Sequence, residues 1–410
     1  MSPLGPRPLD GRRILLGVTG GIAAYKSPAL LRVLQNLGAD VEVIATRAAL
    51  EFVTPLTLAT LSGHPVRSEI FELTPAGIAH TEAARGVDLA LVAPATADFI
   101  GRLAGGLADQ LLLTALMASS VPVLLCPSMN VEMWDNPLVQ ANLARLRELP
   151  RYHIVEPDAG WLACRVEGRG RLPEPEVIAR YAVRLLSRTD LRGRRVVVTA
   201  GPTRERFDPV RFLSNRSTGK MGVALAEAAW ERGAEVVLIR GPGSVPAPHG
   251  VREVAIESTR DLLAAVLEET REAHALVMAA APADFRPATL ADHKLKKTDG
   301  ATLDLVANPD ILATLARERP GLFRLGFAAE TRDFERNAAD KAVRKGLDLI
   351  FVNDVGATAT RTGFEVDTNG GWLLDGAGAR VAEIPVAAKH LVAHSLLDHV
   401  SARIDGGHPR

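Results

Sequence analysis

Apolar runs of strand length alternate with helical patterns through the first half of the chain. Residues 13–19 (RILLGVT) form the first run, and two glycines and a helical pattern follow it. Further apolar runs lie at residues 41–46, 87–93 and 121–125. Apolar strands that are separated by helices predict a parallel sheet covered by helices on both faces.

The same order begins again in the second half. Residues 194–199 (RRVVVT) lead through a glycine-containing loop into a helical pattern and the apolar run 235–239. We therefore predict two α/β domains of the Rossmann-like or flavodoxin-like class, each with a doubly wound sheet. The polar, charged stretch at residues 187–195 marks the boundary, which gives domains of residues 1–188 and 189–410.

The second domain is expected to end differently from the first. Apolar and polar residues alternate around an Asp-Gly turn at residues 370–384, a pattern that predicts a β-hairpin. A final helix is expected at about residues 386–403.

The composition mainly excludes classes of protein. The 410 residues correspond to two or three domains at about 150 residues each. Lys plus Arg and Asp plus Glu both number 48, so the chain has no basic field for a polyanion, and nucleic acid is not expected as a partner. The apolar runs are shorter than the ~20 residues that span a bilayer, so no membrane association is expected. The two cysteines, Cys126 and Cys164, suit a reducing cytoplasm.

Candidate binding residues follow the predicted strands of the first half, where open α/β sheets bind ligands. The loop from Gly17 to Gly21 precedes a helix and suits an anion, although its glycines also suit a tight turn and do not form G-x-G-x-x-G. The small and hydroxylic residues 93–98 would let a flat aromatic ligand approach closely.

Three side chains of the first half are candidates for chemistry. His80 precedes a helix, and taken alone it is more simply explained as a satisfied surface or core residue. Asn130 is placed to hydrogen-bond a carboxylate or amide, and it is also a good helix cap. Cys164 lies in a charged loop with three arginines, which favours a reactive thiol. Cys126 ends an apolar strand and is expected in the core.

Five segments of the first half together resemble the flavin-containing cysteine decarboxylase family: GVTGGIAAYK, the His80 segment, APATADFIGRLAGGLADQL, PSMNVEMW and ACRVEGRGRLPEP. The resemblance covers nearly all of residues 13–180 and implies that His80, Asn130 and Cys164 serve substrate chemistry. It also implies FMN as the cofactor, bound by Gly20, Gly21, Ile22, Ala23, Thr46, Ala93, Pro94, Ala95 and Thr96. Arg165 departs from the glycine that the family places after the cysteine.

The implied reaction explains why such residues are needed. A carboxylate on a saturated carbon leaves poorly because the carbanion has no electron sink, and oxidation of the neighbouring CH2–SH to a thioaldehyde supplies one. The resemblance implies that the flavin accepts the hydride and later returns the electrons to an enethiol. His80 would act as a base or orienting group, Asn130 would hold the carboxylate, and Cys164 would protonate carbon during the return.

The second half carries a different set of candidates. The residues around Gly219-Lys220 do not complete a P-loop, but the hydroxyl-rich turn before the next helix still suits an anion. Asn215 in this turn is either a turn former or a ligand of a reacting phosphate. Asp284 ends an apolar strand and is placed to hold Mg2+. The run Lys294-Leu295-Lys296-Lys297 is either a solvated face or a mobile basic flap over a triphosphate.

Residues 194–400 resemble phosphopantothenate-cysteine ligase, and the two halves in this order resemble the bifunctional bacterial decarboxylase/ligases of coenzyme A synthesis. The resemblance implies CTP as co-substrate, with Mg2+ or Mn2+ held by Asp284. The implied CTP-binding residues are Ala280, Asp284, Lys294, Asn308, Pro309, Asp310, Ile311, Phe327, Lys341 and Lys345. Arg206-Phe207 departs from the Pro-aliphatic pair of the family.

The ligase reaction implied by this resemblance passes through an acyl-cytidylate, stabilised by Asn215 and Lys294. The carboxylate of 4'-phosphopantothenate attacks the α-phosphate of CTP, pyrophosphate leaves, and the amine of L-cysteine displaces CMP. The resemblance further implies homo-oligomers: trimers of the decarboxylase half, dimers of the ligase half, and a dodecamer built from both.

Two other functions compete with this interpretation. Flavoproteins of the same fold also act as regulatory subunits that bind and inhibit phosphatases, but His80, Asn130 and Cys164, together with a complete ligase half, argue against that role. A nicotinamide dehydrogenase is not supported, because G-x-G-x-x-G is missing and Thr46 stands where an acidic residue should end the second strand.

A histidine pair near the C-terminus raises the question of a zinc site. His390 and His394 are four residues apart and would share one face of a helix. His399 would point to the opposite side and does not complete the site. We therefore expect a structural role for this pair.

Overall fold

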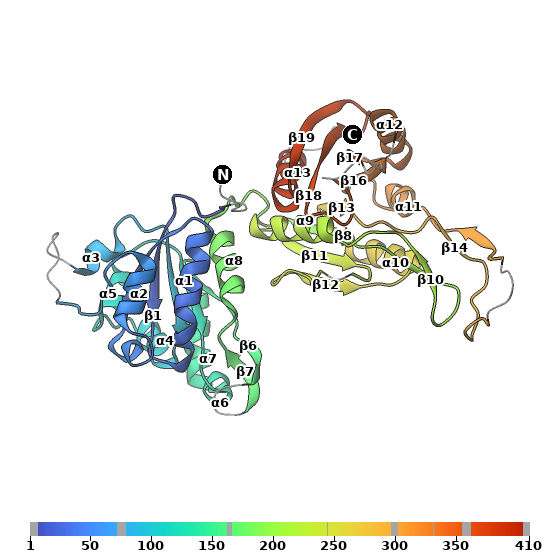
Figure 1. The fold of residues 1–410 in the computed structure, drawn as a ribbon. Helices are drawn as coiled ribbons and strands as arrows, with labels where there is room; N and C mark the ends of the chain where they lie inside the picture. The colour runs from blue at the N-terminus through green and yellow to red at the C-terminus, as the bar shows by residue number, and fades with distance from the viewer. Residues whose placement is uncertain are drawn as a thin grey trace. The chain divides into compact units, whose positions relative to one another are not determined.

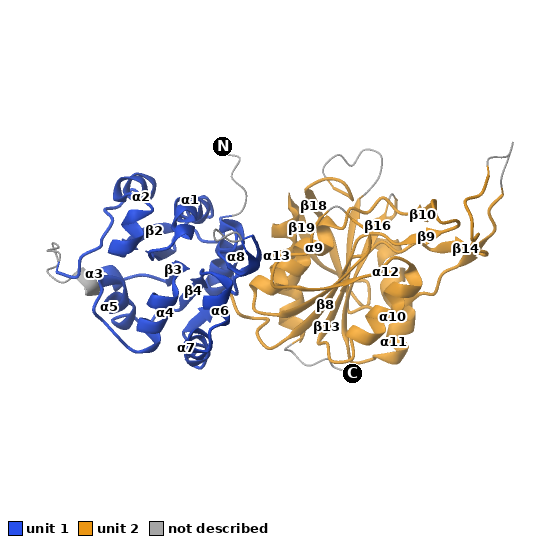
Figure 2. Ribbon diagram, turned by 90° about the horizontal axis from the view of Figure 1, so that it is seen from below, with its two compact units in different colours: residues 1–187 blue, residues 188–410 orange. Residues whose placement is uncertain are grey.

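The computed structural model describes residues 7–71, 79–161, 166–243, 245–296, 302–330, 332–354 and 362–404, without the side chains of residues 79–81. The chain forms two compact units, Met1–Ser187 and Arg188–Arg410, and each is built around its own sheet (Figure 2). The α/β class that the alternating runs predict is confirmed.

The first unit contains a five-stranded parallel sheet in the order β2-β1-β3-β4-β5. This is the flavodoxin-like order, in which the connections change direction between β1 and β3. Each of the four predicted apolar runs overlaps one of these strands. The strands are β1 (Arg13–Val18), β2 (Asp40–Ala45), β3 (Leu89–Ala95), β4 (Val123–Pro127) and β5 (Tyr152–Ile154).

Helices cover both faces of this sheet (Figure 1). On one face lie α1 (Ser27–Asn36), α2 (Pro55–Ser62) and α8 (Pro175–Leu186). On the other lie α3 (Ala79–Ala84), α4 (Ala97–Ala104), α5 (Leu111–Met117) and α7 (Pro137–Arg147). Leu16 of β1 is buried in the first core and the adjacent Leu15 in the second. Successive side chains of a strand point to opposite faces, so a strand that feeds two cores must be apolar throughout.

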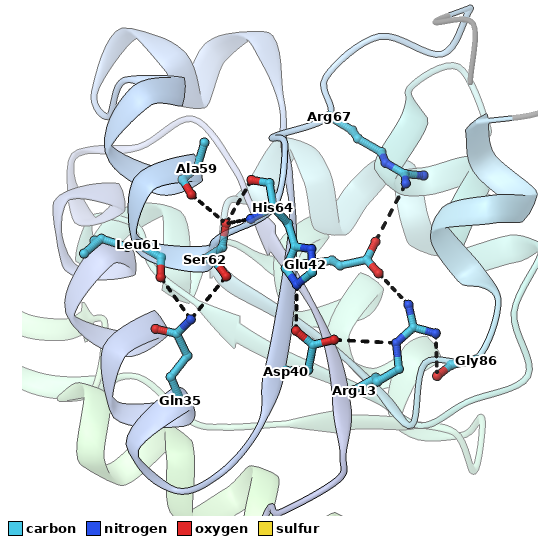
Figure 3. Close-up of polar contacts among 10 residues, drawn as sticks. All are labelled: Arg13, Gln35, Asp40, Glu42, Ala59, Leu61, Ser62, His64, Arg67 and Gly86. Carbon is cyan, nitrogen blue, oxygen red and sulfur yellow. Dashed lines mark hydrogen bonds and ion pairs between the residues drawn. The ribbon is translucent and has the colours of Figure 1, made fainter. Parts of the chain in front are cut away.

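The amino ends of β1 and β2 are joined by a network of charged side chains (Figure 3). Arg13 and Asp40 are register partners, and the Arg13 guanidinium lies 3.9 Å from the Asp40 carboxylate and 2.5 Å from that of Glu42. His64 approaches Asp40 at 2.7 Å, and Arg67 approaches Glu42 at 3.9 Å. Charge pairs of this kind contribute about 1 kcal/mol or less each. They cross-link the amino ends of β1 and β2.

The second unit contains an eight-stranded mixed sheet in the order β12-β11-β8-β13-β16-β17-β18-β19. Its first six strands are parallel, and the last two form the predicted antiparallel hairpin. The strands are β8 (Arg195–Ala200), β11 (Glu235–Arg240), β12 (Arg252–Ala255), β13 (Ala275–Met278), β16 (Phe323–Glu330), β17 (Leu349–Asp354), β18 (Thr368–Asp375) and β19 (Arg380–Ala388).

Helices again cover both faces of the second sheet. One core contains residues of α10 (Thr259–Glu269), α11 (Ile311–Glu318) and α12 (Phe334–Lys345). On the other face, α9 (Lys220–Glu231) packs against α13 (Lys389–Ile404) (Figure 1). The predicted final helix starts too early, because residues 386–388 extend β19. Throughout the described part of the chain, every helix is too short or too polar to span a lipid bilayer.

Three two-stranded ribbons lie outside the two main sheets. They are β6 (Asp158–Trp161) with β7 (Glu167–Arg171), β9 (Arg204–Arg206) with β10 (Phe212–Ser214), and β14 (Phe285–Pro287) with β15 (Leu305–Ala307). All three are antiparallel. Each contributes contacts to one of the two candidate sites described next.

Candidate functional site

A cavity of about 1210 Å³ opens at the carboxyl edge of the first sheet. Gly21, Thr46, Thr96 and Asn130 are among the lining residues that stand directly before a helix. They precede η1 (Ile22–Lys26), η2 (Arg47–Glu51), α4 and α6 (Val131–Asp135), respectively. A helix N-terminus presents N–H groups without intrahelical partners and a partial positive charge. The cavity is therefore suited to an anionic ligand.

Hydrogen bonds fix the loops around this cavity. The Thr19 hydroxyl donates to the carbonyl oxygen of Pro94 at 2.7 Å and accepts the N–H of Thr96 at 3.1 Å, so the loops after β1 and β3 hold each other. A Cβ on Gly20 would collide with Ala48, which follows β2. The glycine therefore allows a close approach of two loops and also lines the cavity.

Most of the residues that the resemblance assigns to FMN line the cavity, and two do not. Gly20, Gly21, Ile22, Ala23, Thr46, Pro94 and Thr96 all contribute to its wall. Ala93 and Ala95 are fully buried, with Ala93 in one core of the first unit and Ala95 in the other. Their side chains pack into the cores on the two faces of the sheet and do not line the cavity. They therefore help to position Pro94 and Thr96, which do.

The cationic side chains that line the cavity are all paired with carboxylates. Arg47 makes two hydrogen bonds to Glu69, at 2.7 and 2.6 Å. Arg102 is paired with Asp98 and Asp109. Lys26 and Arg171 both contact Glu174, at 2.9 and 2.5 Å. These cations are therefore engaged by protein groups, so backbone N–H groups at the helix starts and polar side chains are the other donors that line the cavity. Arg102 and Asp98 lie four residues apart in α4, a spacing that is visible in the sequence, whereas the partners of Arg47 and Lys26 lie in separate segments that no local pattern relates.

Asn130 caps a helix and also lines the cavity. Its side-chain oxygen accepts the N–H of Met133 at 2.7 Å and thereby caps α6. The residue is exposed and lines the cavity, so the NH2 of the same amide is a candidate donor to a ligand. Cys126, in contrast, is fully buried, as predicted, and burial raises the pKa of its thiol.

The hairpin β6–β7 packs on the Asn130 loop. The N–H of Met129 donates to the carbonyl oxygen of Gly170 at 3.0 Å, and the Ser128 hydroxyl donates to the same oxygen at 3.3 Å. Gly170 has a φ of 138°, and a Cβ there would collide with the carbonyl oxygen of Met129. Trp161, at the end of β6, lines the cavity.

Three residues predicted to act on substrate or to shape the site are not seen in full. Cys164 and Arg165 lie outside the described residues. His80 belongs to α3, and its side chain is outside the description. Their roles therefore remain predictions.

The second unit gathers its candidates at the carboxyl edge of β8, β13 and β16. The amide of Asn215 donates to the carbonyl oxygens of Ala281 and Pro282, at 3.2 and 3.0 Å. The amide of Asn308 donates to the carbonyl oxygen of Ala283 at 2.9 Å, and its N–H donates to that of Asp284 at 2.8 Å. Two asparagines from distant segments thus hold the loop after β13. The Asp284 carboxylate at its end is exposed and therefore accessible to a metal ion.

Lysines and an aromatic ring border the same edge. Lys341 donates to the carbonyl oxygen of Phe327 at 2.8 Å. Burial and the neighbouring Lys345 lower the pKa of Lys341, and the carboxylates of Glu330 and Asp284 act in the opposite direction. The Phe327 ring contacts Phe351 edge to face, with 5.4 Å between ring centroids.

The remaining candidates of this half differ in exposure. Asp310 caps α11 through the N–H of Ala313, and its carboxylate lies 3.6 Å from the ammonium of Lys345. Ala280 and Pro309 are partly buried, and Ile311 lies in the core, so its side chain is not available to a ligand. Lys294 is exposed.

Two buried carboxylates that sequence reasoning missed support this edge. Glu205 accepts both the N–H and the hydroxyl of Thr259, at 2.9 and 2.8 Å, and Thr259 also donates to the carbonyl oxygen of Ala283 at 3.3 Å. Asp208 is fully buried and accepts the guanidinium of Arg211 and the N–H of Leu295, which follows Lys294. The sequence feature that could have indicated Glu205 and Asp208 is a charged residue shortly after the apolar strand β8.

The bonds to Asp208 decide its ionisation. Burial alone would raise the pKa of this carboxyl, but the bonds from Arg211 and from the N–H groups of Val210, Arg211 and Leu295 outweigh that effect. The pKa of Asp208 is therefore held well below its usual range. At neutral pH the N–H of Leu295, the residue after Lys294, is therefore bonded to a charged carboxylate. We call this contact the Asp208 anchor.

The chain matches known families over both units. Residues 5–187 match the flavoprotein family, and residues 191–404 match the C-terminal domain of the DNA/pantothenate metabolism flavoproteins. The coenzyme A biosynthesis bifunctional protein CoaBC of Bacillus subtilis (strain 168) is 45% identical over 400 residues, which cover 96% of this chain and 98% of that protein. The protein of the same name from Escherichia coli (strain K12) is 42% identical over 406 residues, 97% of this chain and 98% of that protein.

A solved structure is similar to the second half. The C-terminal domain of a coenzyme A biosynthesis bifunctional protein CoaBC is 34% identical, and the match covers 53% of this chain and 100% of that domain with a TM-score of 0.46. The assignment to a family is based on the sequence relatives, which are more than 40% identical to this chain over nearly its full length. The chain belongs to the family of the coenzyme A biosynthesis bifunctional proteins CoaBC.

Proposed function

We propose that the chain catalyses two consecutive steps of coenzyme A biosynthesis, one in each unit. The second unit condenses 4'-phosphopantothenate with L-cysteine, using CTP and releasing CMP and pyrophosphate. The first unit converts the resulting 4'-phospho-N-pantothenoylcysteine to 4'-phosphopantetheine and carbon dioxide. The observation that carries this proposal is the match of both units, in this order, to bifunctional relatives along nearly the full chain.

The cavity of the first unit fits a flavin mononucleotide. Its volume of about 1210 Å³ exceeds that of typical sites for small molecules, and its helix N-termini would hold the phosphate. Ile22, Met129 and Met133 would cover a flat ring with apolar surface. The flavin-binding residues are then Gly20, Gly21, Ile22, Ala23, Thr46, Pro94 and Thr96. When bound, the flavin supplies a reversible acceptor for two electrons.

Three residues of the first unit act on the substrate. The Asn130 amide donates to the carboxylate of the substrate, since its oxygen is engaged by Met133. His80 acts as a base or orienting group during oxidation at the CH2–SH carbon. Cys164 donates a proton to the carbon that has lost carbon dioxide. Family membership supports the roles of His80 and Cys164. In the sequence, Cys164 also stands between β6 and β7, and β7 contacts the Asn130 loop.

The residues of the second unit bind nucleotide and metal. The exposed Asp284 would coordinate Mg2+ or Mn2+, which offsets charge on the phosphates of CTP. Lys294, Lys341 and Lys345 would surround the triphosphate, and Asn215 and Lys294 would stabilise the acyl-cytidylate. The attack of the phosphopantothenate carboxylate breaks the bond to pyrophosphate. The cysteine amine then forms the amide and releases CMP.

Exposed apolar side chains around the cavity favour an oligomer. Tyr25, Phe71 and Trp161 line the cavity and are 62%, 93% and 71% exposed. Large apolar groups clustered at a ligand site are typical of surfaces that another chain covers. We propose trimers of the first unit and dimers of the second, which together would build a dodecamer. Two cysteines in 410 residues suit a reducing compartment, and we propose the cytoplasm.

An absorption spectrum and a coupled reaction test the proposed function. The purified chain should show a flavin band near ~450 nm. Incubation with 4'-phosphopantothenate, L-cysteine, Mg2+ and CTP should yield 4'-phosphopantetheine, whereas ATP in place of CTP should not. Removal of the metal with a chelator should stop amide formation but leave the decarboxylation of supplied 4'-phospho-N-pantothenoylcysteine. A yellow protein that forms no product would instead favour the flavin-binding regulatory role.

A further inference from the structure

Two histidines of α13 and one glutamate of α9 bring three metal-ligating atoms together in the second unit. Nε2 of His390 lies 2.9 Å from Oε2 of Glu231, and Nε2 of His394 lies 3.1 Å from the same oxygen. The two Nε2 atoms are 3.3 Å apart. The spacing of the two histidines predicts that they share a face of one helix, and the sequence alone favoured a structural role for them over a metal site. The third member comes from a helix that lies 159 residues earlier in the sequence.

The spacing of these atoms matches one face of a tetrahedral metal site. Zinc binds imidazole nitrogen and carboxylate oxygen at about 2.0–2.2 Å, so neighbouring ligand atoms of a tetrahedral site lie about 3.3–3.5 Å apart. The three observed separations are 2.9, 3.1 and 3.3 Å. A small outward shift of the histidines would bring all three atoms to bonding distance of one ion. Two histidines and a glutamate are also a donor set that zinc accepts.

The surrounding residues hold the three ligands in place. Glu231 is 4% exposed, and the adjacent Arg232 is 1% exposed. The Arg232 guanidinium donates to the carbonyl oxygen of His394 at 2.9 Å and pairs with Asp398 at 2.9 Å, so it ties α13 to the end of α9. Asp190 accepts a further bond from Arg232 at 3.0 Å. The positions of Glu231 and His394 are thus fixed relative to each other by contacts that do not involve a metal.

Access also suits a cation. The side chains of His390 and His394 are 23% and 25% exposed, so an ion can enter from solvent and water can occupy a fourth position.

The cluster lies away from the nucleotide residues. Glu231 ends α9, and four residues later β11 begins, so the glutamate of the cluster is at the amino end of that strand. Asp284 and Asn215 lie at the carboxyl ends of the same sheet. An ion here would join two helices and would take no part in the ligase reaction.

We propose that Glu231, His390 and His394 form a binding site for a divalent transition-metal ion of the zinc type, with water as the fourth ligand. The ion fastens the C-terminal helix α13 to α9. The site is distinct from the magnesium site proposed at Asp284 and does not depend on the proposed function.

The test uses the full-length chain after treatment with a chelator. Titration with Zn2+ at about pH 7.5, in competition with a chromophoric chelator, should show one site per chain that Glu231→Gln and His394→Ala each weaken more than about tenfold. Glu231→Gln keeps the shape of the side chain and one oxygen acceptor, so α9 and α13 should stay packed in this variant. His399→Ala is the matched control on the same helix and should bind Zn2+ like the parent.

Two further measurements test the site, and the first of them needs no variant. Co2+ added to the parent should produce the visible absorption of a four-coordinate nitrogen and oxygen site. Zn2+ should also raise the thermal midpoint of the parent but not that of Glu231→Gln. The proposal is overturned if the parent binds no Zn2+ at micromolar concentration, or if both ligand variants bind it as tightly as the parent does. Ligase and decarboxylase activities, measured in parallel, report separately on the proposed function.

Discussion

The side-chain oxygen of Asn130 accepts the N–H of Met133 at 2.7 Å, so one atom of this side chain caps a helix in a residue that also lines the cavity. The two ends of one amide therefore have separable roles. Stability depends on the oxygen, and the proposed substrate contact depends on the nitrogen.

Substitution of Asn130 should separate these roles. Asn130→Asp keeps a good cap but places an anionic oxygen against the substrate carboxylate, so decarboxylation should fall by about 100-fold or more with little change in thermal midpoint. Carbon dioxide release and thermal unfolding measure the two effects. Asn136→Ala is the control: Asn136 caps α7 through Leu138 but does not line the cavity, and its loss should lower stability by about 1 kcal/mol without abolishing turnover. Equal turnover in Asn130→Asp and the parent would refute the assignment.

Replacement of Cys164 should stop the reaction after carbon dioxide has left. Cys164→Ala removes the proposed proton donor, so the product should accumulate as an oxidised enethiol that has two hydrogens fewer than 4'-phosphopantetheine. Mass spectrometry of the product distinguishes the two. Cys126→Ala, a change to the other cysteine deep in the core, should form the reduced product. Reduced product from Cys164→Ala would remove this residue from the mechanism.

The Asp208 anchor should affect only the ligase half. Asp208→Asn weakens the bonds to Arg211 and to the N–H of Leu295, which should raise KM for CTP about tenfold through the adjacent Lys294. Initial rates of CMP release against CTP concentration measure the effect. Asp292→Asn changes an exposed residue of the same segment and should leave KM unaltered. The anchor has no such role if both variants match the parent, or if decarboxylation of supplied intermediate falls as well.

Glu231 should give stability a defined dependence on acid. Its pKa is lowered from 4.5 to about 2 in the folded state. A carboxyl with a lower pKa in the folded than in the unfolded chain adds stability that is fully present above about pH 4.5 and is lost as the pH falls toward about 2. Glu231→Gln should therefore remove on the order of 2–3 kcal/mol at pH 6 and much less near pH 2.

Urea unfolding followed by tryptophan fluorescence, with a chelator present, tests the acid dependence. Trp230 adjoins Glu231 in α9 and reports on this region. Glu235→Gln, at a residue whose side chain is 71% exposed, is the control and should follow the parent at both pH values. Parallel curves for Glu231→Gln and the parent from pH 6 to pH 2 would contradict the expected linkage.

Sequence reasoning succeeded where one physical rule determines the structure. Strands buried on both faces must be apolar throughout, which is why the runs that became β1, β3 and β8 were recognisable. The ribbons were missed for the opposite reason. The β7 segment reads EGRGR, and its pairing depends on contacts with the Asn130 loop and not on any local pattern.

The candidate sites divide in the same way. Thr96 and Asn130 were predicted because residues that follow strands of an open α/β sheet face its ligand edge. The partners Asp208 and Leu295 are 87 residues apart, and Glu231 and His390 are 159 apart. Helical periodicity relates only residues within a few turns, so no pattern along the chain could join these pairs.

The close contact between Gly170 and the carbonyl oxygen of Met129 has a consequence for genetics. Any side chain at position 170 would push the β6–β7 hairpin off the Asn130 loop, while the cores formed by the sheet and its helices would remain intact. Missense alleles at this codon should therefore yield normal amounts of folded protein without decarboxylase function. In a complementation screen they would be sorted with active-site alleles, although no atom of Gly170 takes part in the chemistry.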